Sequence, residues 1–449
     1  MYPSILFLGA SILLFSFNIN AFPLRNWDEA WYAEIVRNMA GGDHNLLVPF
    51  WNGQYYFDKP PLYFWLSFPF FKIFGPGEWQ VRIISVLAAA SATLLVFLIG
   101  KKLFNQKVGI LSSLVFVIIG QVWVRFSHGN LDALLVALFL ATFYTHLFAK
   151  QKKFAVLSGI FLGLGFLVKG WFLGLFPLAA ILLFSWITKK RLPYNLSLII
   201  LFATLSSGWW YLLGALRFGR PFVNWYLLIV ADGKLGHFSL QPFWYLVRDT
   251  GIWLIPTALY LIEVVRNKNL IAFALIIFLF IFSLGFLPEK FDWYNLPVYP
   301  FVAILTGYSL WELFKKHRKA VSLLVALITI AQVVVVYKIE SIYPDRSSTG
   351  ANLGLVARDI VQPDDALVLD DRDFTSFLYY SNHKKIFVVS KEGGKPGEWW
   401  VVKYEDLPAF TNHPILLISK DLNNFPPEFS EQPVLKEYMS YRFVRLAIQ

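Results

Sequence analysis

Long apolar stretches recur along the first three quarters of this chain, and they constrain its fold more than any other feature. About eleven of them approach the ~20 residues that an α-helix needs to cross a bilayer. They cover residues 2–22, 79–99, 108–125, 131–149, 154–169, 171–188, 194–215, 245–265, 269–287, 293–312 and 320–338. Hydrophobic residues make up 57% of the 449 residues and charged residues only 15%, which excludes a soluble enzyme. The sequence predicts a polytopic α-helical membrane protein.

Basic residues gather in alternate loops between these stretches. Lysine and arginine cluster at 101–107, 150–153, 189–191, 266–268 and 315–319. Because short loops rich in Lys and Arg stay in the cytoplasm, the alternation predicts a cytoplasmic N-terminus and places residues 341–449 outside. The first stretch lacks a preceding basic segment, so we expect a membrane span there and not a cleaved signal peptide. We therefore expect a multi-pass protein of the cytoplasmic (inner) membrane.

Residues 341–449 differ in composition from the rest. They carry 12 Lys/Arg against 15 Asp/Glu, whereas the first 340 residues carry 28 against 14. The net charge of +11 therefore reflects membrane topology, and we expect no nucleic-acid partner. "DALVLD" and "KIFVVS" are typical of strands and "TSFLYYS" of a short helix between them. We predict a transmembrane domain over 1–340, with an outer loop at 23–78 that holds juxtamembrane helices such as 61–74, and a soluble α/β domain over 341–449.

The segment "NWDEAWYAEIVRNMA", Asn26 to Ala40, places two adjacent acids directly after the first span. Apolar residues recur every four positions, which predicts an amphipathic helix with one face in lipid: Trp27, Trp31, Ile35 and Met39. Asn26 can cap this helix with Glu29 at its third position, so a capping-box-like start explains Glu29 without a function. Asp28 is not needed for that cap and is the stronger functional candidate.

Further polar residues gather at the predicted outer ends of spans. Asp132 begins the fourth span beside Arg125 and His128, where it either caps the helix or belongs to a site. Lysines are unusual on the outer side, yet this side holds Lys59 in "YYFDKPPLYFW", Lys169 in "FLVKGW", and Lys290 with Tyr294 in "PEKFDWYNLPVYP". A lysine held there suits a phosphate as a charged partner, or it reaches lipid headgroups.

Carboxylates, three lysines and a tyrosine at outer span ends match the chemistry of a lipid-phosphate donor site. Lysine and tyrosine would stabilise charge on a departing phosphate, and a carboxylate would take the proton from an incoming hydroxyl. A transporter or flippase is an alternative, but transport sites lie near mid-membrane and the sequence shows no inverted repeat. A non-catalytic envelope protein would leave Lys59, Lys290 and Tyr294 unexplained.

The string "DEAWYAEIVRNM…GDHNLLVPFWNGQYYFDKPPLYFW" resembles the first outer loop of the GT-C glycosyltransferases of the protein mannosyltransferase-like superfamily. It is most similar to the aminoarabinose transferases that modify lipid A in the cell envelope. Four more segments resemble the family in the right order: "LDALLVALF", "FLVKG", "PFWYLV", and the spaced pattern from Lys290 to Pro300. The resemblance covers most of the chain.

The resemblance implies a role for each matching residue. It implies that Asp28 is the general base, with Glu29 as its partner and Asp132 as a second acid of the site. It implies that Lys59 binds the donor phosphate and that Lys169, Lys290 and Tyr294 lie near it. Independently of the resemblance, the polar cluster beside Asp132 makes His128 a candidate substrate-binding residue. The donor would be a polyprenyl-phosphate sugar, transferred with inversion to a hydroxyl or phosphate of a membrane lipid or glycan. We expect the enzyme to act as a monomer in the lipid bilayer.

Two departures from the family pattern concern substrate contacts. Relatives often carry a basic residue in the outer loop before "PFWYL", where this chain reads "VADGKLGHFSLQ", and Lys234 or His237 can take its place. Ala30 and Trp31 stand where relatives often have a polar and a basic residue. The sequence therefore does not predict the acceptor or the sugar.

Asp28, Glu29 and Asp132 supply the hard oxygen ligands that a divalent cation prefers. The branch of the superfamily that the chain resembles is not expected to need a metal, so we predict neither a metal nor another cofactor.

Overall fold

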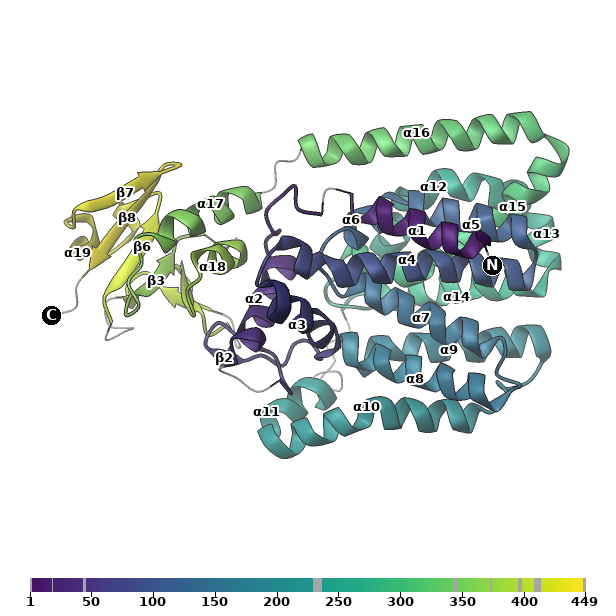
Figure 1. Ribbon diagram of the computed structural model, residues 1–449, viewed down its shortest axis with the longest axis horizontal. Helices are drawn as coiled ribbons and strands as arrows, with labels where there is room; N and C mark the ends of the chain where they lie inside the picture. The colour runs from purple at the N-terminus through teal and green to yellow at the C-terminus, as the bar shows by residue number, and fades with distance from the viewer. Residues whose placement is uncertain are drawn as a thin grey trace.

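A computed structural model describes residues 2–17, 19–42, 46–228, 236–342, 346–371, 374–394, 398–407 and 413–446. A bundle of helices forms one end of the molecule and a sheet domain forms the other (Figure 1). The bundle contains α1 (Tyr2–Phe15), α4 (Glu78–Leu103), α5 (Gln106–Ile118), α6 (Gly120–Phe126), α7 (Asp132–His146), α8 (Lys152–Lys169), α9 (Trp171–Lys189), α10 (Leu196–Phe218), α12 (Gln241–Leu259), α13 (Leu261–Arg266), α14 (Lys268–Leu284), α15 (Tyr299–Lys316) and α16 (Arg318–Ile342). Each predicted apolar stretch falls on one or two of these helices.

The bundle packs through small residues as well as large ones. Helix α8 packs against α7 and α10, and α5 packs against α4 and α15. Gly159 and Gly163, one turn apart on α8, face α10 so closely that a Cβ on either would collide with its backbone. Small residues at this spacing let apolar helices approach each other, and packing at such contacts drives helix association in lipid.

By length and composition, two of the described helices, α4 and α10, can cross a membrane. Helices α5 and α6 make a third span if the 68° bend between them lies within one crossing. Other stretches are interrupted: 245–265 divides at Tyr260, shortly after Pro256, and 293–312 begins with a 3₁₀-helix, η2 (Asp292–Val298). The number of spans therefore stays a prediction.

The surface of α10 fits contact with lipid. Large apolar side chains stay exposed along it, at 59% for Leu205, 60% for Leu212 and 74% for Leu216. A row of exposed leucines on a soluble protein would favour aggregation, whereas in a bilayer these side chains contact apolar lipid chains.

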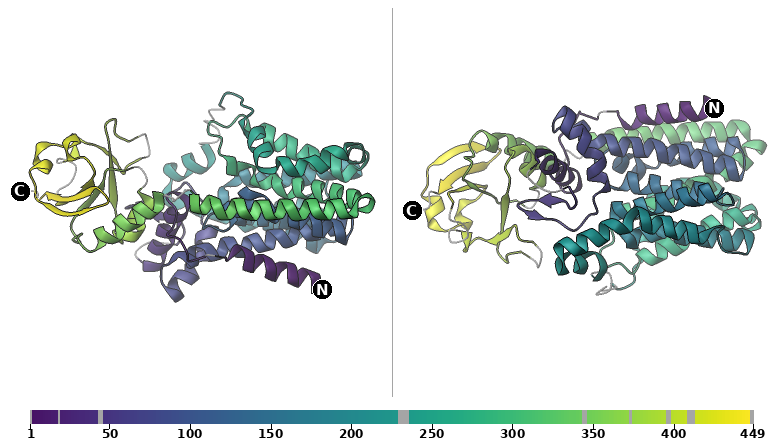
Figure 2. Two further views of the ribbon diagram at one scale, coloured as in Figure 1. Left: turned by 90° about the horizontal axis from the view of Figure 1, so that it is seen from above. Right: turned by 60° about the horizontal axis from the view of Figure 1, so that its bottom comes forward.

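The loops that carry the basic clusters lie together at the end of the bundle far from the sheet (Figures 1 and 2). They are the connections α4–α5, α7–α8, α9–α10, α13–α14 and α15–α16. The alternation read from the sequence thus corresponds to two opposite ends of the bundle. Which end faces the cytoplasm stays a prediction.

Short elements lie between the bundle and the sheet domain (Figure 1). They are α2 (Asp28–Gly41), the hairpin β1 (Phe50–Trp51) and β2 (Gln54–Tyr55), α3 (Leu62–Phe74), α11 (Arg220–Val223) and the π-helix η1 (Asn224–Leu228). The helix predicted over 61–74 is confirmed as α3. The apolar face of α2 was predicted to lie in lipid, and this is wrong: Ile35 and Met39 are buried in the protein core. Helix α2 packs against α3, α18 and β1, so protein and not lipid surrounds these side chains.

The C-terminal part is an α/β domain. It contains α17 (Arg346–Arg358), β3 (Ala366–Leu369), α18 (Thr375–Ser381), β4 (Ile386–Ser390), β5 (Val401–Lys403), β6 (Ile415–Ser419), the 3₁₀-helix η4 (Leu422–Asn424), α19 (Pro427–Ser430), β7 (Val434–Tyr438) and β8 (Tyr441–Leu446). The strand order is β5-β4-β3-β6-β8-β7, parallel from β5 to β6 and antiparallel in the last two pairs. Strand β6, "ILLIS", is buried throughout, as a near-continuous apolar run in a parallel sheet should be. The two predicted strands and the helix between them are confirmed as β3, β4 and α18.

Candidate active site

One guanidinium group joins the two carboxylates singled out from the sequence. Asp28 begins α2, Asp132 begins α7, and Arg125 lies on α6. Arg125 Nη2 is 2.7 Å from Asp28 Oδ2 and 2.6 Å from Asp132 Oδ2. Sequence reasoning placed Arg125 beside Asp132 but did not predict that it also reaches Asp28, which lies 97 residues away. The only indication of this contact in the sequence was that Arg125 is a basic residue at the predicted outer end of a span.

The two carboxylates differ in their surroundings. The side chain of Asp132 is 4% exposed, and its Oδ1 is 2.5 Å from Lys169 Nζ while Arg125 occupies Oδ2. The side chain of Asp28 is 32% exposed, and beside Arg125 it accepts a hydrogen bond from the Tyr32 hydroxyl at 3.1 Å. Asp132 is thus fixed between two cations, whereas Asp28 stays accessible to an incoming molecule.

A cavity of about 330 Å³, its open mouth included, lies beside these groups. Asp132, Lys169 and Tyr294 contribute its polar groups, and the other lining residues are Leu135, Val136, Leu173, Phe280, Trp293, Leu296 and Pro297. Lys169 Nζ lies 5.6 Å from the centre of the Tyr294 ring. A few polar groups beside a mainly apolar lining are typical of small-molecule pockets.

The Arg125 guanidinium lies over a ring of the same cavity wall, 4.6 Å from the centre of Trp293. A cation over an indole face gains electrostatic stabilisation beyond its ion pairs. Trp293 therefore fixes the group that joins Asp28 and Asp132.

Lys59 lies in the loop between β2 and α3, with its Nζ 2.5 Å from Asp58 Oδ2. Burial by itself would lower the pKa of Lys59, but Asp58 outweighs it, and Asp28 and Tyr294 add to the rise. The pair with Lys59 also lowers the pKa of Asp58. Burial would raise the pKa of this carboxyl group, but the positive charge of Lys59 more than offsets the effect of burial. Lys59 is therefore a stable cation within electrostatic range of Asp28 and Tyr294. Sequence reasoning did not single out Asp58.

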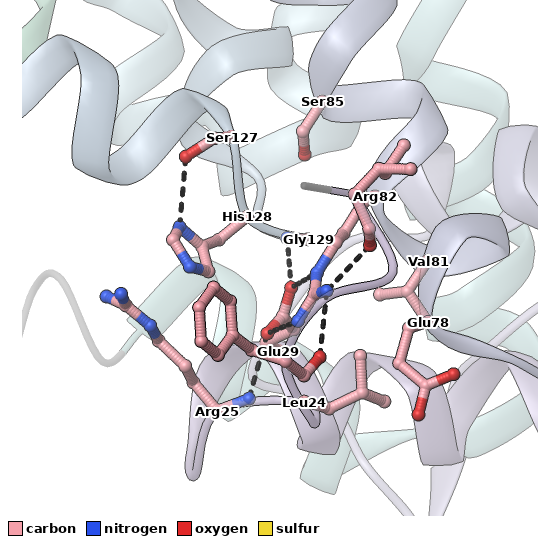
Figure 3. Close-up of polar contacts among 12 residues, drawn as sticks. Leu24, Arg25, Glu29, Glu78, Val81, Arg82, Ser85, Ser127, His128 and Gly129 are labelled. Atoms are coloured by element: carbon pink, nitrogen blue, oxygen red, sulfur yellow. Dashed lines mark hydrogen bonds and ion pairs between the residues drawn. The ribbon is translucent and has the colours of Figure 1, made fainter. Parts of the chain in front are cut away.

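Glu29 lies in a closed ion pair with Arg82 (Figure 3). Arg82 Nε is 2.7 Å from Glu29 Oε1 and Arg82 Nη2 is 3.0 Å from Oε2. The backbone amides of Arg25 and Gly129 donate to the same carboxylate at 2.8 and 2.7 Å. Burial alone would raise the pKa of Glu29, but Arg82 outweighs it and holds this pKa well below its usual range. These contacts give Glu29 a structural role in the pair with Arg82, which differs from the capping box predicted from the sequence.

Arg82 also forms hydrogen bonds with the chain that follows α1. Its guanidinium donates to the carbonyl oxygens of Ile19, Phe22 and Pro23 at 2.7, 3.0 and 3.1 Å. The Glu29–Arg82 pair therefore joins three segments, namely the chain before α2, helix α4 and the loop after α6 (Figure 3).

Asn26 does not cap α2, so the predicted capping box is wrong. The residue before the helix is Trp27, and none of the described side chains makes a cap there. Asn26 Oδ1 instead accepts from the backbone amide and the hydroxyl of Ser376 at 2.9 and 2.7 Å. The sequence could not show that α18 offers competing donors.

His128 lies in the loop between α6 and α7. Burial, helped by the charge of Arg25, lowers the pKa of His128 to about 3, so its imidazole is neutral at physiological pH. Its Nδ1 is 2.6 Å from the carbonyl oxygen of Val124. A neutral ring held in this way cannot balance the charge of a phosphate.

Two other predicted ligands lie on neighbouring loops. Lys290 Nζ donates to the carbonyl oxygen of Leu287 at 2.5 Å. His237 is exposed just before α12, and the preceding Gly236 bonds to Phe286. Among the contacts of the described residues, neither side chain reaches the cavity. Lys234 lies outside the described residues.

The three acids predicted as possible metal ligands do not converge. Arg125 stands between Asp28 and Asp132, and Arg82 occupies Glu29. In the part of the chain that the structure describes, no three His, Asp or Glu side chains gather as metal ligands.

Residues 58–216 match the dolichyl-phosphate-mannose-protein mannosyltransferase family. An uncharacterised protein of Aquifex aeolicus is 26% identical over 329 residues, which cover 71% of this chain and 76% of that protein. The undecaprenyl phosphate-α-4-amino-4-deoxy-L-arabinose arabinosyl transferase of Wigglesworthia glossinidia brevipalpis is 25% identical over 343 residues. That alignment covers 70% of this chain and 60% of the transferase, so it spans less than two thirds of the named relative.

Solved structures extend the likeness to almost the whole chain. ArnT from Cupriavidus metallidurans in the apo state superimposes with a TM-score of 0.77 at 16% identity, covering 98% of this chain and 97% of ArnT. This protein has the GT-C fold. The same ArnT bound to undecaprenyl phosphate gives a TM-score of 0.74. The resemblance predicted from the motifs is therefore confirmed.

In this GT-C chain the region that matches the family and the candidate site overlap only in part. The matched residues include Lys59, Arg125, Asp132 and Lys169. Asp28 precedes the matched region and Tyr294 follows it, so the fold brings to the site two residues that the family match does not cover.

Proposed function

We propose that this protein is an inverting glycosyltransferase. It moves a sugar from a polyprenyl-phosphate donor to a hydroxyl or phosphate acceptor at the outer face of the cytoplasmic membrane. One observation carries the proposal: the accessible Asp28 and the buried Asp132 both pair with Arg125. They lie beside a cavity whose lining is mainly apolar and includes the Lys169 side chain. The family match and the GT-C fold support the reaction class.

The donor lies with its phosphate near Lys169 and Tyr294 and its prenyl chain along the apolar lining. Lys59 adds a second positive charge within range of the same groups. The undecaprenyl phosphate bound in ArnT and the named aminoarabinose transferases support this class of donor. An ammonium group acts on phosphate as a point charge, so two lysines suit a phosphate that becomes a leaving group.

In the reaction the acceptor oxygen attacks the anomeric carbon while the bond from that carbon to the phosphate oxygen breaks on the opposite side. Asp28 takes the proton of an acceptor hydroxyl, because it is the more exposed carboxylate of the pair. The bonding electrons leave with the polyprenyl phosphate, and Lys59 and Lys169 stabilise its additional charge. A phosphate acceptor already carries an anionic oxygen and needs no base.

Asp132 and Arg125 hold this arrangement in place. Lys169 and Arg125 together saturate Asp132, so it is poorly suited to accept a proton. Arg125 offsets the repulsion that two neighbouring carboxylates would otherwise exert on each other. Asp132 therefore positions Arg125, and Arg125 positions Asp28.

The test uses purified protein in nanodiscs that contain lipid extract of the source membrane. Mass spectrometry follows the loss of polyprenyl-phosphate sugar and the gain of glycosylated product for wild type and Asp28→Asn. Asp421→Asn, at an exposed loop of the C-terminal domain, is the matched control. We expect donor consumption by the wild type and the control and at least a ~100-fold loss in Asp28→Asn. A folded wild type that consumes no donor would overturn the proposal.

A further inference from the structure

The residue before Asp28 has a backbone conformation that side chains normally avoid. Trp27 has φ 65° and ψ −120°. These angles match those of the first central position of a type II′ turn, about +60° and −120°, where glycine usually stands. A larger residue persists in such a region only when its surroundings impose it, and such positions cluster at functional sites.

The conformation of Trp27 determines how α2 starts. The amide of Ala30 donates to the carbonyl of Arg25 at 3.0 Å, and the amide of Trp31 makes the first α-helical bond, to the carbonyl of Trp27 at 2.8 Å. Asp28 is the first residue of the helix. A rotation at Trp27 would therefore move the Asp28 carboxylate relative to Arg125 and the cavity.

The C-terminal domain supplies contacts that hold this turn. The Trp27 amide donates to Thr375 Oγ1 at 2.5 Å. Ser376 donates to Asn26 Oδ1 from its amide and its hydroxyl. Thr375 and Ser376 begin α18 and are 1% and 0% exposed, so water cannot replace these bonds.

The same face of the domain is attached to the outer loop at several other points. The Phe374 ring meets the Trp27 ring edge-on at 5.9 Å, and Trp51 contacts Trp400 at 4.9 Å. Asn52 exchanges two hydrogen bonds with the backbone of Ile386, at 2.8 and 3.1 Å. These contacts hold the C-terminal domain against the region between α1 and α4, which includes α2 and Asp28.

We infer that Thr375 and Ser376 are positioning residues for the transfer reaction. They hold the Asn26–Trp27 turn in its glycine-like conformation and so aim Asp28 at the acceptor, which makes the C-terminal domain part of the active site. The inference rests on the proposed function, because it assigns these two residues a role in that reaction.

The experiment compares steady-state kinetics of full-length variants in nanodiscs. Thr375→Val keeps the shape of the side chain but removes the acceptor for the Trp27 amide, and Thr375→Ser keeps the acceptor. Ser381→Ala is the matched control, since the Ser381 hydroxyl bonds within α18, to the carbonyl oxygen of Leu378 at 3.0 Å. We expect kcat of Thr375→Val to fall about 10-fold or more, because small misplacements of a catalytic group are costly. The donor KM should stay within about twofold, because the donor residues lie elsewhere.

Thr375→Ser should recover most of the lost kcat, and Ser381→Ala should retain it. Should Thr375→Val fail to fold, Asn26→Ala with Asn26→Asp as its rescue tests the same turn from the other side. Wild-type kcat in Thr375→Val, or equal losses in Thr375→Val and Ser381→Ala, would overturn the inference alone. A wild type without transfer activity would overturn the proposed function and the inference with it.

Discussion

Replacement of Glu29 by glutamine gives the sharpest test of how the outer loop is held. The Glu29 carboxylate accepts two bonds from Arg82 and one each from the amides of Arg25 and Gly129. Glutamine keeps one acceptor oxygen, but its NH₂ group would face two of these four donors. A buried donor without an acceptor costs about 1–3 kcal/mol, and breaking a buried ion pair from one side costs about 3–5 kcal/mol. We expect Glu29→Gln to destabilise the protein by about 3 kcal/mol.

The assay is thermal unfolding in detergent at a fixed scan rate, followed by tryptophan fluorescence, since unfolding of such proteins is often irreversible. For a chain of 449 residues, a loss of about 3 kcal/mol corresponds to roughly 3 °C in Tm. Glu405→Gln is the control, because the Glu405 side chain is 78% exposed. Adding Arg82→Met should cost less than the sum of the single changes, since no unpaired charge is then left behind.

The pH dependence of this difference has a defined sign. The pKa of Glu29 is depressed in the folded state, so its contribution is present above the unfolded value of about 4.3 and fades as pH falls below it. The Tm difference between wild type and Glu29→Gln should therefore shrink in acid. Equal Tm values for Glu29→Gln and Glu405→Gln would refute the reasoning. A ~100-fold loss of kcat at unchanged Tm would instead make Glu29 catalytic.

Three further predictions concern the cavity and its border. Lys169→Met should weaken binding of polyprenyl phosphate about 10-fold or more, because a charge-assisted contact is lost; unchanged affinity in a scintillation binding assay would contradict this. Asp132→Asn should lower kcat but leave more activity than Asp28→Asn, since Asp132 only positions Arg125; the reverse order in the nanodisc assay would exchange the two roles. The pKa of His128 is lowered to about 3 in the folded state, so the unfolded state binds the extra proton between about pH 6.5 and 3 and stability falls as pH falls through that window. As pH falls from 6.5 to 4, the Tm of His128→Gln should therefore fall less than the Tm of the wild type. The same dependence of Tm on pH in both proteins would refute this.

The sequence by itself predicted the helices and the candidate chemistry. Apolar runs become helices in a bilayer because the backbone must satisfy its own hydrogen bonds there, so composition and length suffice. The alternating runs of the C-terminal domain likewise predicted β3, β4 and α18. Asp28, Asp132, Lys169 and Tyr294 were singled out because charged or polar residues at outer span ends are costly without a purpose.

Only the tertiary structure decided which of these residues meet. Arg125 reaches Asp28 across 97 residues, Glu29 turns to Arg82 across 53, and Trp27 bonds to Thr375 across 348. Local pattern cannot encode such pairs, because each depends on how distant segments pack. For the same reason the sequence predicted a cap at Asn26, whereas Ser376 of α18 donates to the Asn26 side chain instead. The physical limit is that a sequence pattern reports the preference of each segment, while the partners of a buried polar group are fixed only when the whole chain is assembled.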